Sequence, residues 1–120
     1  MENSDRFERG LKNLQAIDGD KGVDITDSLG DLGKYIVEFA FGDIYDRKGL
    51  SFREREIATI AMLACLGGRE PQLDVHIHAG LNVGLTEQEI EEVIIQTVPY
   101  AGFPSAINAM NVFKNIKNKQ

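Results

Sequence analysis

The chain has 120 residues, of which 42% are hydrophobic and 27% charged, and its formal net charge is −6 at pH 7. This length predicts one domain with a single core, spanning residues 1–120. Since the lysines and arginines form no basic patch, we expect neither nucleic acid nor an anionic membrane surface as a partner.

The cysteine content and the N-terminal segment predict the compartment. The single cysteine, Cys65, excludes an intramolecular disulfide and favours a reducing environment. The first ten residues contain no apolar signal-peptide core, and no run approaches the roughly 20 apolar residues of a membrane span. We therefore expect a soluble, cytoplasmic protein, in which Cys65 is a small buried hydrophobe.

The N-terminal segment, residues 1–27, predicts one helix followed by a loop. Residues 5–17 have apolar side chains at helical spacing, and residues 18–27 are polar and rich in glycine. A second helix is expected from about Ser28, with Thr26 or Asp27 as its N-cap. Its buried face is predicted to contain Leu29, Leu32, Ile36, Phe39 and Ala40, and its wide apolar surface indicates more than one neighbour.

The next helix is expected to be central. Ser51 and Glu54 have the spacing of a capping box, and the stretch after Glu56 is apolar on all sides up to Gly67 and Gly68. Pro71 then predicts the first turn of a fourth helix, which ends at Gly84.

A second capping box, Thr86 with Glu89, predicts the start of a fifth helix. Its buried stripe is Ile90, Val93, Ile94 and Thr97, and Pro99 should end or kink it. A last helix is expected after Pro104. No β-type alternation is sustained, so the sequence predicts an all-α fold of five to six helices.

Both histidines of the chain lie on the fourth predicted helix. Residues two apart on a helix point to nearly opposite sides, so His76 and His78 do not form a metal-binding pair, and we expect no metal. Asp74, four residues before His78, predicts a surface ion pair. His76 is a candidate general acid/base because imidazole titrates near neutral pH. The alternative is a structural histidine with one hydrogen bond.

Four features carry a resemblance to a known family. They are the segment Phe41-Gly42-Asp43-Ile44-Tyr45, the opening Arg53 to Glu56, the spacing from His76 to Gly84 with the following Leu-Thr-x-x-Glu-Ile, and the corner Tyr100 to Pro104. Together, over about residues 28–113, they resemble the carboxymuconolactone decarboxylase family. The resemblance implies an alkyl hydroperoxide reductase D-like helical fold that assembles into rings, as a homotrimer or homohexamer.

The redox branch of the same superfamily carries a C-x-x-C pair four residues before the histidine. Arg69 and Gln72 occupy these positions here, so both thiols are absent. Without two thiols there is no disulfide cycle, and we expect no thiol-dependent peroxidase activity.

The resemblance implies decarboxylation of a small carboxylated lactone. His76 would deliver the proton. Glu56 aligns with the acidic residue that takes part in proton transfer in the redox branch of the superfamily. The alternative for Glu56 is a solvated carboxylate in the first turn of its helix. Four arginines are candidates to hold the substrate carboxylate, namely Arg47, Arg53, Arg55 and Arg69, and Arg53 and Arg55 are preferred. The alternative is that they are solvated charges or partners in ion pairs between subunits. Tyr100 would donate a hydrogen bond or simply pack.

Two other functions stay open at this point. No organic cofactor is required if the substrate supplies its own electron sink, and the sequence contains no cofactor-binding signature. The rival from another class is a non-catalytic oligomeric binding or scaffold protein of the same fold, because a fold does not carry activity with it. A peroxidase or disulfide-reductase relative is the third alternative.

Overall fold

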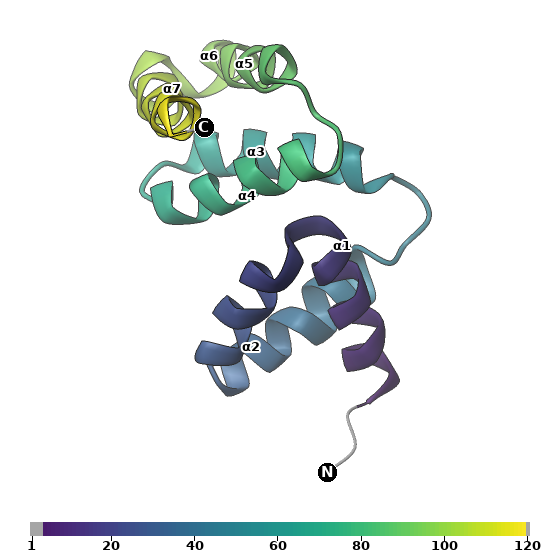
Figure 1. The fold of residues 1–120 in the computed structure, drawn as a ribbon. Helices are drawn as coiled ribbons and strands as arrows, with labels where there is room; N and C mark the ends of the chain where they lie inside the picture. The colour runs from purple at the N-terminus through teal and green to yellow at the C-terminus, as the bar shows by residue number, and fades with distance from the viewer. Residues whose placement is uncertain (1–3, 120) are drawn as a thin grey trace. The chain divides into compact units, whose positions relative to one another are not determined.

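The computed structural model describes residues 4–119, which form helices and contain no strand. The chain divides into two compact units, with the boundary between Phe52 and Arg53. The first contains α1, α2 and η1, and the second contains α3 to α7 (Figure 1). If α2 and η1 are counted as one continuous helix and α6 as a corner, six helices are present, which confirms the predicted all-α class.

The first helix, α1, is longer than the sequence predicts. It runs from Asp5 to Ser28 and begins at Ser4, whose hydroxyl accepts from the amide of Phe7 at 3.1 Å. Gly19 interrupts it with a φ of 65° and a ψ of −161°, which bends α1 visibly in Figure 1. The predicted loop at residues 18–27 is therefore wrong, because the chain returns to helix directly after the bend.

The start of the second predicted helix is also different. Thr26 lies inside α1, and its hydroxyl donates to the carbonyls of Gly22 and Val23 rather than capping a new helix. The new helix, α2, spans Asp31–Tyr35, and its N-cap Gly30 makes no side-chain capping bond. The predicted N-cap, Thr26 or Asp27, is thus wrong.

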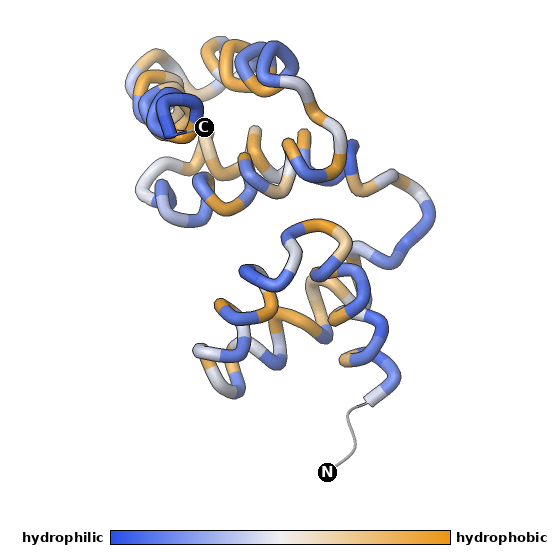
Figure 2. The backbone as a smooth tube through the Cα atoms, viewed as in Figure 1, coloured by the Kyte–Doolittle hydropathy of each residue, from blue (hydrophilic) through white to orange (hydrophobic). Residues whose placement is uncertain are grey.

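The chain continues from α2 into a π-helix, η1, which spans Ile36–Ile44 and is largely apolar (Figure 2). Its wider turn is visible in the bond from the Tyr45 amide to the Ala40 carbonyl, at 2.8 Å. The buried residues are Gly33, Val37, Glu38, Phe41 and Gly42. The predicted buried face is mostly wrong: Leu29, Leu32 and Phe39 are exposed by 45%, 60% and 60%.

The first half of α1 packs closely against η1. A side chain at Gly10 would overlap the carbonyl oxygen of Val37, so only glycine permits this approach. Arg9 and Asn13 donate to the carbonyls of Gly42 and Phe41, at 3.1 and 2.8 Å. These are carbonyls near the end of η1, where a helix leaves its last carbonyls without internal partners.

The second unit contains five helices: α3 (Phe52–Leu66), α4 (Glu70–Asn82), α5 (Glu87–Gln96), α6 (Val98–Ala101) and α7 (Phe103–Asn118). Their core is formed mainly by Ile60, Ala64, Leu73, Ile77, Leu85, Ile90, Ile94, Ala109, Phe113 and Ile116.

Several predicted boundaries in this unit are confirmed. Gly67 and Gly68 follow α3 with φ values of 66° and 69°, and Thr86 and Glu89 form the expected capping box of α5. Pro99 lies in α6, just after α5 has ended. Within residues 4–119, no helix combines the length and the apolar character needed to cross a bilayer.

Candidate functional site

The buried side of α3 includes one ionisable residue. Glu56, Ile60 and Ala64 follow one another at intervals of four, and the exposed fraction of Glu56 is 0%. Burying a carboxylate costs several kcal/mol unless hydrogen bonds compensate it. The first turns of α3 therefore place a charged group where a polar neighbour is required, and the solvated alternative for Glu56 is wrong.

His76 on α4 is a hydrogen-bond partner of this carboxylate. Its Nδ1 atom lies 2.8 Å from Glu56 Oε1, although 20 residues separate the two in sequence. A carboxylate accepts only, so we assign the proton to Nδ1, which donates to Glu56. The other ring nitrogen, Nε2, is then the atom that can exchange a proton with a ligand.

The His76 side chain is partly buried, whereas its partner Glu56 is fully buried. The His76 side chain is 23% exposed, whereas the Glu56 side chain is 0% exposed. The imidazole is thus oriented by a buried group while part of it still reaches the surface. A carboxylate that orients an imidazole and stabilises its protonated form is an arrangement suited to general acid/base chemistry.

His78, two residues further along α4, has a different environment. Its Nδ1 donates to the Asp74 carbonyl at 2.9 Å and lies 3.3 Å from the Asp74 carboxylate. Both side chains are about 40% exposed, which confirms the predicted pairing of His78 with Asp74 at the surface. Over residues 4–119, no group of three or more His, Cys, Asp or Glu side chains is arranged to hold a metal.

Arg53, expected to hold a substrate carboxylate, forms an ion pair with Glu89. The same Glu89 carboxylate accepts from the Thr86 amide at 2.9 Å in the capping box of α5. The first turn of α3 is therefore connected to the first turn of α5. Sequence reasoning recognised Glu89 only as a helix cap, because nothing local relates two residues 36 positions apart.

The remaining expected residues differ in how far they are buried. Arg55 is half-buried on α3, and Cys65 is half-buried rather than fully buried. Tyr100 on α6 is 83% exposed, so it does not pack into the core of its unit. The structure thus brings Glu56 to His76 and Arg53 to Glu89, and leaves Tyr100 at the surface.

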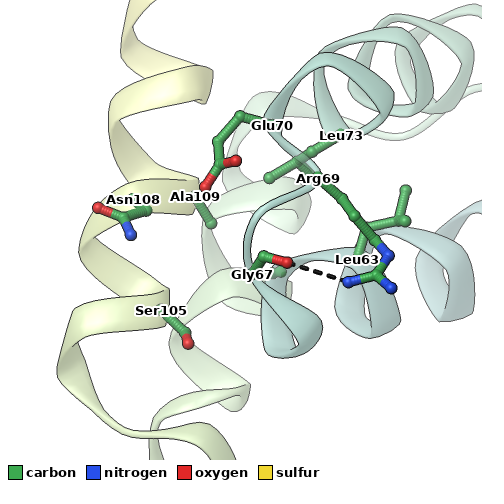
Figure 3. A pocket seen from close by; sticks show the side chains of 9 residues that line it. Leu63, Gly67, Arg69, Glu70, Leu73, Ser105, Asn108 and Ala109 are labelled. Carbon is green, nitrogen blue, oxygen red and sulfur yellow. Dashed lines mark hydrogen bonds between the residues drawn. The ribbon is translucent and has the colours of Figure 1, made fainter.

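The positions of the absent thiols, Arg69 and Gln72, lie at the N-cap and in the first turn of α4. Figure 3 shows the Arg69 guanidinium donating to the Gly67 carbonyl, at 3.1 Å, beside a small pocket that Ser105 and Asn108 of α7 also line. The pocket volume is about 10 Å³. That volume is enough for at most one water molecule, so this pocket offers no room for an organic substrate.

Glu38 is a second buried acidic residue, and the sequence does not mark it as a site candidate. Glu38 on η1 is 8% exposed, and its carboxylate accepts from the Ser4 hydroxyl at 2.6 Å. In the sequence, Glu38 is recognisable only as a single acidic residue inside an otherwise apolar stretch. The bond joins the start of α1 to η1, so Glu38 has a structural role within the first unit.

The comparisons with known proteins identify the family of this chain. The model of the carboxymuconolactone decarboxylase family matches residues 30–115, and the chain belongs to this family. The 4-carboxymuconolactone decarboxylase of Acinetobacter baylyi is 33% identical, covering 97% of this chain and 90% of that protein. A nitrosuccinic acid decarboxylase of Metarhizium robertsii is 33% identical over 69% of this chain and 57% of its own length.

Proposed function

We propose that this protein is a lyase that decarboxylates a small carboxylic acid, with His76 as the general acid/base and Glu56 as the group that orients it. The observation that carries the proposal is the bond between His76 Nδ1 and a fully buried carboxylate. The membership in the family and the names of two relatives, both decarboxylases, support the same reaction type.

The reaction constrains the substrate. When the carbon–carbon bond to the carboxylate breaks, carbon dioxide leaves and its bonding electron pair remains on the substrate. That pair must be delocalised into a neighbouring acceptor, such as the conjugated carbonyl of a lactone, and the resulting dienolate then takes up one proton. We therefore propose a carboxylated lactone, or another acid with its own electron acceptor, as the substrate class, with no cofactor.

His76 would supply that proton from Nε2, while Nδ1 continues to donate to Glu56. The neutral imidazole then recovers a proton from solvent, and the partial exposure of His76 supports this exchange. Arg53 and Arg55 are proposed to bind the substrate carboxylate, since a guanidinium can donate two parallel hydrogen bonds to it. Arg53 would have to share or exchange its ion pair with Glu89. Tyr100 is proposed as a further hydrogen-bond donor to the substrate.

The test is turnover of 4-carboxymuconolactone, followed by carbon dioxide release and by loss of the substrate absorbance. Wild-type protein should turn it over, and His76→Ala should not, with His78→Ala as the matched control on the same helix. A protein that binds the acid tightly without releasing carbon dioxide would instead be a binding or scaffold protein.

We also propose that the protein works as a homo-oligomer, a trimer or a hexamer. Large apolar side chains are exposed on both units, among them Leu32, Tyr35 and Phe39 at 60–61%, and Tyr100 and Phe103 at 83% and 70%. Apolar surface of this kind in a small protein is typical of association sites. Analytical ultracentrifugation at micromolar concentration should show three or six chains, and a stable monomer would contradict this prediction.

A further inference from the structure

The first unit contains a cavity of about 240 Å³ that no step of the proposed reaction uses. Phe7 and Leu11 line it from the first half of α1, and Val23 and Thr26 line it from the second half. The bend at Gly19 makes this possible, because it lets two halves of one helix border the same space (Figure 1). Val37 of η1 lines it as well.

The lining of this cavity is mixed, with an apolar part and a polar part of similar size. Phe7, Leu11, Val23 and Val37 contribute hydrocarbon, and the Thr26 hydroxyl proton is already used in bonds to carbonyls within α1. A cavity of about 150 Å³ lined by such side chains is sufficient to hold benzene. The space here is larger and opens to solvent, so its apolar part has room for an alkyl or aryl group of about six carbon atoms while a polar end reaches the opening.

Three of the remaining residues that line the cavity are charged. Asp27, Asp31 and Lys34 line it and are exposed, which gives two carboxylates against one ammonium group. The whole chain is also acidic, with a net charge of −6. The local and the overall charge both favour a cation over an anion.

From this combination we propose that the cavity binds an amphipathic primary amine in its protonated form. Its alkyl or aryl group of about six carbons would lie between Leu11, Val23 and Val37, and its ammonium group would lie near Asp27 and Asp31. Small-molecule sites commonly combine apolar side chains with a few charged groups that fix the orientation of the ligand.

The experiment is an NMR titration of the full-length, ¹⁵N-labelled protein with three probes of equal chain length. We expect n-hexylammonium to shift the amide signals of the cavity-lining residues, with saturation in the millimolar range, and 1-hexanol and hexanoate to bind at least several-fold more weakly. The proposal is overturned if hexylammonium causes no saturable shift, or if hexanoate binds as tightly.

Two kinds of variant test whether hexylammonium binds in this cavity. Val23→Phe should fill the cavity and abolish the shifts, and circular dichroism would show that it is folded. If Val23→Phe does not fold, Asp31→Asn decides: it should weaken hexylammonium about two- to fivefold, as expected for one exposed charge. The control Asp20→Asn changes an exposed carboxylate that does not line the cavity. Equal weakening by Asp20→Asn and Asp31→Asn, or full binding by a folded Val23→Phe, would overturn the proposal.

Discussion

Replacing His76 by alanine should affect both stability and turnover, and the structure lets the two be separated. From the sequence alone, this substitution would be expected to leave folding largely intact. Because the ring donates to a carboxylate that is 0% exposed, its removal takes a charge-assisted hydrogen bond from a buried group. Such bonds contribute roughly 1.5–3 kcal/mol.

The expected loss of stability is moderate. For a domain of this size, each kcal/mol lowers the melting temperature by about 3–6 °C, so His76→Ala should melt about 5–18 °C below wild type. A domain with a typical unfolding free energy of 5–15 kcal/mol then remains folded at 25 °C. His78→Ala removes only an exposed ion pair with Asp74 and should cost about 0–1 kcal/mol.

Turnover is the second measurement. Per folded molecule, His76→Ala should lose about 10²–10⁴-fold in kcat, the usual effect of removing a general acid. Glu56→Gln should lose activity too, and the double variant should be little worse than either single one, because groups that act as a unit are not additive. A His76→Ala protein that melts early yet turns over fully at 25 °C would falsify the assignment. Equal losses in His76→Ala and His78→Ala would contradict it as well.

Three further predictions concern stability. Gly10→Ala should destabilise the protein by about 1–3 kcal/mol in urea unfolding, because its methyl group would overlap the Val37 carbonyl, and an unchanged midpoint would contradict that packing. The hydrogen bond from Arg6 holds the pKa of Asp43 below its ordinary value, so the stability it adds is present above about pH 4 and is lost as the pH falls further. Urea midpoints from pH 7 to pH 2 should therefore fall less steeply below pH 4 in Asp43→Asn than in wild type. Thr86→Ala should cost about 0.5–2 kcal/mol through its capping box, measured by thermal melting, and no change would argue against that cap.

The second unit was easier to predict than the first because its signals are local. Capping residues, prolines and paired glycines lie next to the helix ends that they determine, as Thr86 and Pro99 do. The predicted stripe of the fifth helix is confirmed at Ile90, Ile94 and Thr97, which are exposed by no more than 3%, whereas Val93 is half-buried.

The first unit was mispredicted because its packing depends on small residues and on a non-standard helix. Gly22 and Gly33 are buried at close approaches, although the residues around Gly22 have the composition of a loop. In η1 the π-helical turn shifts the side-chain periodicity, so Val37 and Phe41 become buried and Phe39 is exposed. A pattern that assumes 3.6 residues per turn assigns these faces wrongly.

The candidate site was partly predictable. The residue types and the resemblance pointed to Glu56 and His76, but their hydrogen bond results from the packing of α3 against α4 and has no local signal. The same holds for Arg53, whose pairing with Glu89 depends on where α5 begins.

The close packing of α1 on η1 has a consequence for building chimeras with relatives. The family model matches residues 30–115, so α1, which ends at Ser28, lies before the matched region. Yet Arg9 and Asn13 of α1 bind carbonyls of η1, and Gly10 permits the contact. A graft of the matched region alone would leave those carbonyls without their α1 donors. A chimera built from two relatives should therefore take α1 and η1 from the same parent protein.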